Sequence, residues 1–323
     1  MNIVALESRD ISVLKQLEKG ITAIASDKPE LFCRQAKFAA AQLPIPITLR
    51  LMEFALRGSP TGFLLFQNIP IDNTTPKTPP ENTYFLGEKT PLSKIQGILI
   101  SAMGNMIAYE AEGYGRLFQD VVPMQHMAKN QTSLGSDIEL EIHTEQAFSK
   151  LRPDILSLAC VRGDEKAYTY ILPVKSVIDN LTPFEIQRLR EPLWITGVDL
   201  SFKLHGKPFL EGDLRGPMPI LHGSVEDPEL IFDQDLMMGT TPEADDLVKK
   251  IIDIYYQHRI AHCLQPGEII FVDNRRAVHG RSSFSPKYDG YDRFLVRCFA
   301  TLDYEKSAYA RIDGGRTVAA IYS

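Results

Sequence analysis

Several features are scarce in this sequence of 323 residues, and each scarcity argues against a class of protein. Its four cysteines are scattered, without the spacing of a metal-binding motif, so we expect reduced thiols and no disulfide framework. No apolar run approaches the length of a membrane span, and the first twenty residues include acidic side chains but no apolar signal-peptide segment. We therefore expect a cytoplasmic protein with no membrane partner.

An excess of positive charge is also absent. The net charge is -6 and no long basic run is present, which argues against a nucleic-acid partner. Hydrophobic residues make up 44% and charged residues 24% of the chain, which is ordinary for a soluble globular protein. The length permits one large domain or two smaller ones, and no repeat or clear boundary divides it.

The order of sequence patterns predicts helices first and strands later. Apolar spacings of three and four predict helices within residues 1–57, and further helices are expected over 93–110, after Thr182 and over 241–264. Residues 205–240 are rich in Gly, Pro and Asp and have little periodicity. Strands are expected over 62–71, 138–143, 154–162, 168–174, 267–274 and 293–302. Because strands and helices do not alternate regularly, this order favours a mainly antiparallel sandwich with helices outside.

Two arginines stand among large apolar residues in "RFLVRCFA", residues 293–300. Strand alternation places Arg293 and Arg297 on one face with Leu295 and Phe299, while the other face is apolar throughout. A strand covered on both faces would bury two guanidinium groups, which keep their charge and each need an anion. They could form structural salt bridges or bind the carboxylates of small molecules.

A histidine and a glutamate stand two positions apart in "EIHTEQAF", residues 141–148. With seven histidines in the chain, roughly one such pair is expected by chance, so the pair alone decides nothing. Residues i and i+2 of a strand share a face, which would let His143 and Glu145 chelate one ion. His279 follows another predicted strand and could be a loop histidine without a role, or it could add a second imidazole. Two imidazoles and one carboxylate form the facial triad of non-haem Fe(II) oxygenases, which leaves metal positions open.

Taken with its surroundings, this triad resembles that of a known family, the clavaminate-synthase-like branch of the Fe(II)/2-oxoglutarate dioxygenases. The resemblance covers nearly the whole chain and rests on "LFQDVVP", "LEIHTEQAF", "RPDILSLACVR", "PGEIIFVDNRRAVHGR" and "YDRFLVRCFA" in that order. It implies an α+β, mainly β fold, a double-stranded β-helix (jelly roll) flanked by helices, in one catalytic domain over 1–323. Residues 1–57 would be a helical N-terminal region and about 118–310 the jelly-roll core, with a lid insert near 205–240.

The resemblance also implies roles for single residues. His143, Glu145 and His279 match the iron ligands. Arg293 matches the arginine that pairs with the distal carboxylate of 2-oxoglutarate, and Thr169 matches a hydroxyl that helps to hold it. The implied cofactors are Fe(II), 2-oxoglutarate as co-substrate, and O2. A halogenase needs glycine or alanine at position 145, so the glutamate there disfavours halide chemistry.

A free L-α-amino acid is the small-molecule substrate that the resemblance implies. Arg297 matches the arginine that binds the substrate carboxylate, and Gln119 and Ser133 match substrate-contacting positions. Glu145 would lie near the α-amine. Whether the enzyme acts alone or as a homo-oligomer is left open.

A pair of acids predicts the substrate side chain. Asp233 and Asp235 stand two apart in "ELIFDQDLMMG", and on an exposed loop such a pair is usually solvated. In the resembling arginine hydroxylases, however, an Asp-x-Asp at the matching distance before the second histidine lies in a lid over the substrate. We therefore expect a basic amino acid, with lysine favoured over arginine because two separated carboxylates suit a compact ammonium.

Several alternatives stay open at this point. The enzyme could hydroxylate a neutral amino acid such as asparagine, or act as an oxidase or desaturase with the same iron centre. A jelly roll that binds a small molecule without catalysis is disfavoured, because all three ligands and Arg293 are present. His258 and His262 stand four apart on a predicted helix, but position 259 is arginine and not the catalytic glutamate of a zinc motif.

Overall fold

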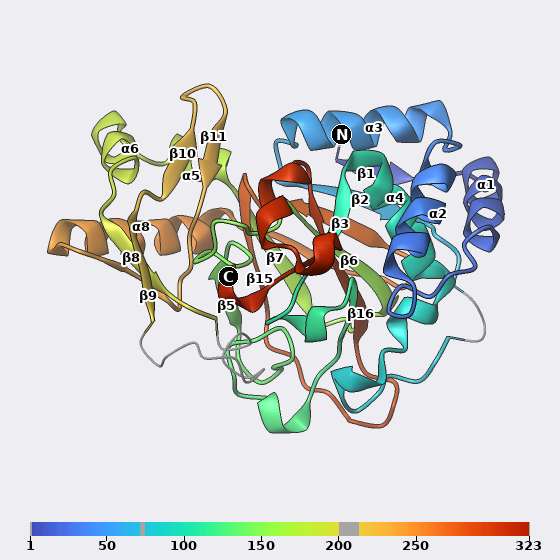
Figure 1. Cartoon of the computed structure of the whole chain (residues 1–323). Coiled ribbons are helices and arrows are strands. Elements are labelled where there is room, and N and C mark those ends of the chain that lie inside the picture. Colours follow the sequence, from blue (N-terminus) through green and yellow to red (C-terminus); the bar gives the residue numbers. More distant parts are fainter. Residues whose placement is uncertain (1, 72–74, 200–212, 323) are drawn as a thin grey trace.

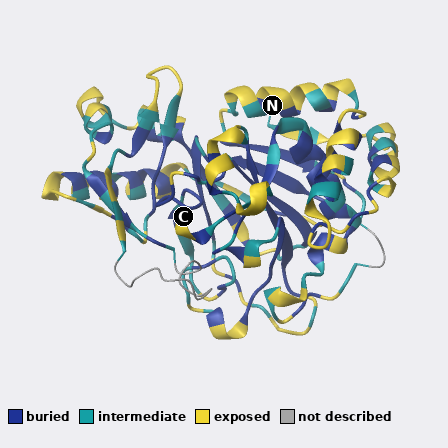
Figure 2. Ribbon diagram, in the orientation of Figure 1, coloured by how far each residue is buried: buried dark blue, intermediate teal, exposed yellow. Residues whose placement is uncertain are grey.

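Two β-sheets pack face to face, and helices cover the outer face of each sheet (Figure 1). The computed structural model of the chain describes residues 2–71, 75–199 and 213–322. The strands at the centre of this layered body are mostly buried (Figure 2).

The helical N-terminal region is confirmed. Apolar residues at helical spacing bury one face of the first three helices, which pack on the fourth; the fourth is buried on most of its surface and contacts the sheet. A proline in the first turn starts three of the four. These helices are α1 (Ser8–Lys19), α2 (Pro29–Ala40), α3 (Ile45–Arg57) and α4 (Pro91–Met103).

The larger sheet has the order β1-β2-β14-β6-β16-β3-β17, and β4 also pairs with β16. Within the described residues, its pairings are antiparallel except for β1 with β2 and β3 with β17. The antiparallel sandwich expected from the sequence is therefore present. The strands are β1 (Ile3–Ala5), β2 (Phe63–Gln67), β3 (Asn105–Tyr109), β4 (Phe118–Val121), β6 (Ile155–Arg162), β14 (Ile269–Asp273), β16 (Phe294–Thr301) and β17 (Thr317–Val318).

The smaller sheet faces it with the order β13-β7-β15-β5. A three-stranded sheet and a hairpin lie beyond it, with helices that cover its outer face. The elements on this side are β5 (Leu140–His143), β7 (Tyr168–Pro173), β13 (Ile260–Cys263), β15 (Ala277–Arg281), β8 (Trp194–Gly197), β9 (Leu214–Met218), β10 (Leu221–Gly223), β11 (Pro228–Leu230), β12 (Met237–Gly239), α5 (Val174–Asp179), α6 (Pro183–Leu189) and α8 (Pro242–His258). The capping box expected at Thr182 is present at the start of α6.

Strand alternation separates the apolar layers, as β16 illustrates. Phe294 and Val296 pack under the N-terminal helices, whereas Leu295 and Phe299 pack between the two sheets. A third cluster fills the space between the smaller sheet and α5 and α8. The alternation read from the sequence is confirmed within β16. Arg297 lies on the inner face of this strand, and Arg293 directly precedes it on the wall of the same cavity.

Phe271 on β14 is a test of the layer beneath the N-terminal helices. Its ring is fully buried and meets Phe66 edge to face, with ring centroids 5.9 Å apart. We expect Phe271→Ala to lower the free energy of unfolding by about 3–5 kcal/mol, because it removes a buried ring and leaves a cavity. Urea unfolding followed by circular dichroism measures this, and Phe271→Leu, which keeps most of the apolar volume, is the control and should lose clearly less than the alanine variant. A loss below about 1 kcal/mol for the alanine variant would show that this layer collapses around the gap.

Two predicted helices end earlier than expected. The helix expected over 93–110 ends at Met103. The backbone of Gly104 passes so close to β16 that a Cβ atom there would lie 2.5 Å from the Thr301 carbonyl oxygen, and the chain then enters β3 beside β16. The helix expected to reach about residue 264 ends at His258, and β13 then pairs with β7. His258 and His262 therefore do not share a helix, which removes the zinc alternative.

Residues 205–240 also contain more structure than their composition predicted. From residue 213 onward they form the short strands β9 to β12, while positions 200–212 lie outside the described residues. The chain also makes short 3-10 helices: η1 (Asn82–Tyr84), η2 (Gly87–Lys89), η3 (Gly113–Gly115), η4 (Gln125–Met127), η5 (Glu305–Ala310), η6 (Ile312–Gly314) and η7 (Ala320–Tyr322). No helix in the described ranges is long and apolar enough to span a bilayer.

Candidate active site

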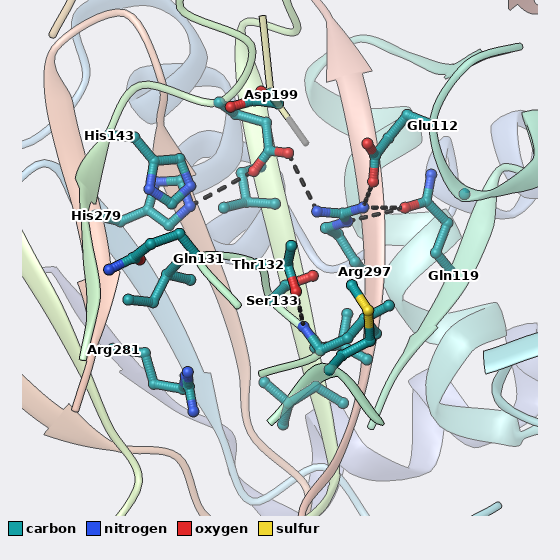
Figure 3. Close-up of a pocket in the computed structure, with 18 of the residues that line it drawn as sticks. Glu112, Gln119, Gln131, Thr132, Ser133, His143, Asp199, His279, Arg281 and Arg297 are labelled. Carbon is teal, nitrogen blue, oxygen red and sulfur yellow. Dashed lines mark hydrogen bonds and ion pairs between the residues drawn. The ribbon is translucent and has the colours of Figure 1, made fainter. Parts of the chain in front are cut away.

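A cavity of about 500 Å³ opens between the two sheets (Figure 3). Strands of both sheets line it, together with the loop before β5 and the segment between β11 and β12. Every site residue that the sequence predicted lies on its wall: His143, Glu145, His279, Arg293, Thr169, Gln119, Ser133, Asp233, Asp235 and Arg297.

Two strands of the smaller sheet bring the predicted triad together. His143 on β5 and His279 on β15 are direct cross-strand neighbours, with ring centroids 4.4 Å apart. Glu145 Oε2 lies 3.5 Å from His279 Nε2, and one ligand atom from each of the three residues lies within 4.8 Å of the others. His279 is therefore a strand residue and not a loop histidine.

Glu145 reaches the triad by a different route from the one expected. β5 ends at His143, so Glu145 lies beyond the strand. The Asn274 side chain holds it there: Oδ1 accepts a hydrogen bond from the Glu145 N–H (2.7 Å), and Nδ2 donates to the Glu145 carbonyl (3.1 Å). Thr144 is fixed as well, because its N–H donates to the Phe232 carbonyl at 2.7 Å. Asn274 follows β14, so a long-range contact sets the position of the carboxylate.

The pKa values of Glu145 and His279 are shifted in the directions that suit a divalent metal. Burial raises the pKa of Glu145, but Arg297 and a hydrogen bond with His279 outweigh burial and bring it to about 2. Burial, with a contribution from His143, lowers the pKa of His279 to about 4. His143 Nδ1 lies 2.8 Å from the Glu141 carbonyl, and in the tautomer that donates there Nε2 is free to bind a metal. Glu145 is thus a carboxylate and His279 a neutral imidazole at neutral pH.

Two polar groups further along the cavity have little or no compensation. Arg293 is buried and, within the part of the chain that the structure describes, it has no carboxylate within ion-pair distance. Thr169 Oγ1 is buried without a hydrogen-bond partner among the same residues. Burial lowers the pKa of Arg293, so the protein disfavours its charge and an anion would offset that cost. The structural salt bridge considered for Arg293 is absent from the described residues, and a carboxylate-binding role fits it better.

Arg297 behaves differently. Its Nη1 donates to Glu145 Oε1 at 3.1 Å, its Nε donates to Gln119 Oε1 at 2.9 Å, and its Nη2 pairs with Glu112. This guanidinium therefore already has structural ion pairs, and one of them involves a member of the triad. Glu112 was missed in the sequence analysis, because nothing in "EAEGYG" separates it from an ordinary surface acid.

Acidic side chains gather on another part of the wall. Asp233 is buried and Asp235 is exposed, so the first is not the solvated loop acid that its composition permitted. Asp199 and Glu141 line the same cavity, and the sequence analysis missed both as site residues. Burial first and neighbouring carboxylates second raise the pKa of Asp199 and of Glu141. Burial also raises the pKa of Asp233, and a cation beside this wall would favour the charged form of these carboxylates.

Two imidazoles and a carboxylate in a cavity between β-sheets, beside buried arginines, define the class of non-haem iron oxygenases. The comparisons agree with this class. The family model described as "Taurine catabolism dioxygenase TauD, TfdA family" matches residues 218–299.

Similar proteins of known activity narrow this class to a family. An L-lysine 3-hydroxylase of Catenulispora acidiphila is 48% identical over 99% of this chain and 90% of its own length. Clavaminate synthase 2 of Streptomyces clavuligerus is 30% identical over 88% of this chain and 89% of its own. The structure of an asparagine oxygenase with Fe(II), 2S,3S-3-hydroxyasparagine and succinate superposes with a TM-score of 0.90, at 28% identity and 99% coverage of both chains. The chain belongs to the clavaminate-synthase-like Fe(II)/2-oxoglutarate-dependent dioxygenases, in the branch that contains the amino-acid hydroxylases.

Proposed function

We propose that this enzyme hydroxylates free L-lysine, with Fe(II), 2-oxoglutarate and O2. Lysine, 2-oxoglutarate and O2 give hydroxylysine, succinate and CO2, so one oxygen atom enters the C–H bond and the other enters succinate. The observation that carries the proposal is the acidic wall of Asp199, Asp233, Asp235 and Glu141 in the same cavity as the triad. The 48% identity to a lysine 3-hydroxylase supports it independently.

We assign the iron to His143, Glu145 and His279. Their donor set fits Fe(II), and three protein ligands leave positions for a 2-oxo acid and O2. The bound iron supplies the oxidation chemistry of the family. We further propose that the two facing sheets are a double-stranded β-helix and that the chain is one catalytic domain, with a lid that includes Asp233.

The remaining residues position the two organic substrates. Arg293 and Thr169 offer a buried cation and a free hydroxyl to the distal carboxylate of 2-oxoglutarate. Arg297 offers a guanidinium to the lysine α-carboxylate, and Glu145 and Glu112 lie beside it for the α-amine. Closing such a site around the substrate excludes water and brings one carbon close to the metal.

We propose C3 as the reacting carbon. Arg297 contacts Glu145, so an amino acid held at its α-carboxylate has its first side-chain carbon beside the triad, whatever the length of the chain beyond. The lysine relative is named as a 3-hydroxylase, and the asparagine oxygenase was solved with a 3-hydroxy product. These two names agree although the side chains differ.

The proposal is tested by incubating the enzyme with Fe(II), 2-oxoglutarate and each of the proteinogenic amino acids. Mass spectrometry detects a product with one added oxygen, and NMR of that product gives the carbon. We expect lysine to be converted first and at C3. If asparagine or another neutral amino acid is hydroxylated and neither lysine nor arginine is, the substrate proposal is wrong and the iron assignment stands.

Asp233 is the sharpest test of the cationic side chain. Asp233→Asn keeps the shape of the side chain but removes a buried charge. The fall in kcat/KM for lysine should correspond to a loss of about 2–5 kcal/mol of transition-state stabilisation. Decay of 2-oxoglutarate without lysine should change little, because Asp233 is outside the triad. Asp246→Asn, on the exposed face of α8, is the matched control and should have normal kcat/KM. Normal lysine kinetics in Asp233→Asn would exclude its contact with the ammonium.

A further inference from the structure

Arg281 is a buried arginine of the cavity wall that none of the roles above uses. It is 4% exposed on β15, and Figure 3 places it in the cavity below the triad. Its Nε and Nη1 have no hydrogen-bond partner within the described ranges, and its Nη2 reaches only the Ile138 carbonyl at 3.5 Å. A buried guanidinium with two unused donors is costly unless a ligand completes it.

The surroundings of Arg281 point to a carboxylate. On the neighbouring strand, its direct cross-strand partner is Thr169, whose hydroxyl is also buried and unpaired among the described residues. The ring of Phe284 lies under the Arg281 guanidinium at 4.9 Å and near that of Arg293 at 5.9 Å. Two cations and one hydroxyl thus meet at one end of the cavity, around an aromatic ring and with no acid of the described chain paired to either cation.

Strand β15 fixes the distance between Arg281 and the proposed metal ligand His279. Arg281 lies two residues after His279, on the same face of β15, which separates the two Cα atoms by roughly 7 Å along the strand. A five-carbon 2-oxo diacid that binds the metal at one end would extend along β15 and end beside Arg281 and Thr169. Neither side chain can retreat easily, because both lie in paired strands.

We propose that Arg281 binds the distal carboxylate of 2-oxoglutarate together with Arg293, and that it determines the chain length of the 2-oxo acid that the enzyme accepts. This inference rests on the proposed function, because it assumes that 2-oxoglutarate is the co-substrate. A diacid one methylene longer would drive its carboxylate into the Arg281 guanidinium. A shorter side chain at this position would make room for it, while Arg293 still supplied one cation.

The test compares the binding of 2-oxoglutarate and 2-oxoadipate to the wild-type protein, Arg281→Ala and Arg281→Lys. Isothermal titration calorimetry on protein loaded with Mn(II) measures binding without turnover. In the wild type we expect 2-oxoglutarate to bind about 10- to 200-fold more tightly than 2-oxoadipate, the range for one misplaced methylene. In Arg281→Ala we expect 2-oxoglutarate to bind about 10- to 100-fold more weakly, and the preference for it to shrink by about 10-fold or more.

Arg50→Ala, which removes a half-exposed arginine of α3, is the matched control and should bind both acids as the wild type does. Arg281→Lys keeps the charge and most of the buried stem but loses the planar fork, so it should bind 2-oxoglutarate with intermediate affinity. This variant carries the test if the alanine variant does not fold. Unchanged 2-oxoglutarate affinity in a folded Arg281 variant, with only a lower melting temperature, would overturn the inference. Failure of the wild-type Mn(II) protein to bind 2-oxoglutarate would instead overturn the proposed function.

Discussion

Replacing His279 by alanine will abolish turnover while the protein stays folded. The change removes one of two imidazoles from the triad, and the remaining His143 and Glu145 cannot hold the metal in the same geometry. Loss even of a group that supports a metal ligand costs about 10- to 100-fold, so loss of a ligand itself should cost more. Succinate formation measured by mass spectrometry and bound iron measured by elemental analysis should both fall, with an unchanged circular dichroism spectrum.

His258→Ala is the control for this variant, because His258 is exposed at the end of α8. It should retain full activity and full iron content. If His279→Ala produced succinate at the wild-type rate, the triad would have no part in the reaction. If it kept its iron but lost only hydroxylation, His279 would act on the substrate and not on the metal.

Replacing Arg293 by alanine will raise the concentration of 2-oxoglutarate that turnover requires. Loss of a buried charged partner of a carboxylate costs about 2–5 kcal/mol, which corresponds to roughly 30- to 5,000-fold in affinity. The residue is buried and lacks an ion pair within the described residues, so its removal breaks no structural contact of that kind. The dependence of the rate on 2-oxoglutarate measures the effect, and iron content should be unchanged.

Arg293→Lys restores the charge without the fork and should recover part of the affinity. Loss of iron from either variant would place Arg293 among the groups that support the metal. An unchanged requirement for 2-oxoglutarate, in a variant that folds and binds iron, would return Arg293 to a purely structural role.

Local patterns predicted most of the fold. The alternation in β16 and the apolar spacings of α1 to α3 are consequences of burial on one face, and such patterns are visible in a short stretch of sequence. The ends of α4 and α8 were wrong for a different reason. Gly104 stops α4 because β16 comes close to it, and β7 pairs with residues after His258, so both limits depend on partners distant in sequence.

The candidate site divides in the same way. His143, Glu145 and His279 stood in recognisable segments, and their assembly in one cavity agrees with the expectation. Glu112 and Asp199 stand in segments without any pattern, and only the folded chain brings them to the cavity. Asn274 was in a segment used for the family resemblance. Its two hydrogen bonds to the Glu145 backbone, however, depend on how the ends of β14 and β5 lie next to each other in the fold.

The ion pair between Arg297 and Glu112 places one charge of each sign where we propose that the substrate's α-carboxylate and α-amine bind. A zwitterion carries one charge of each sign a short distance apart, so it can insert between this cation and anion and leave both compensated. The same amino acid within a peptide chain has lost both charges and would separate the pair without replacing either partner. The proposed role of Arg297 in holding the α-carboxylate therefore predicts that the enzyme acts on free amino acids and not on residues within proteins, independently of the side chain that the acidic wall is proposed to bind.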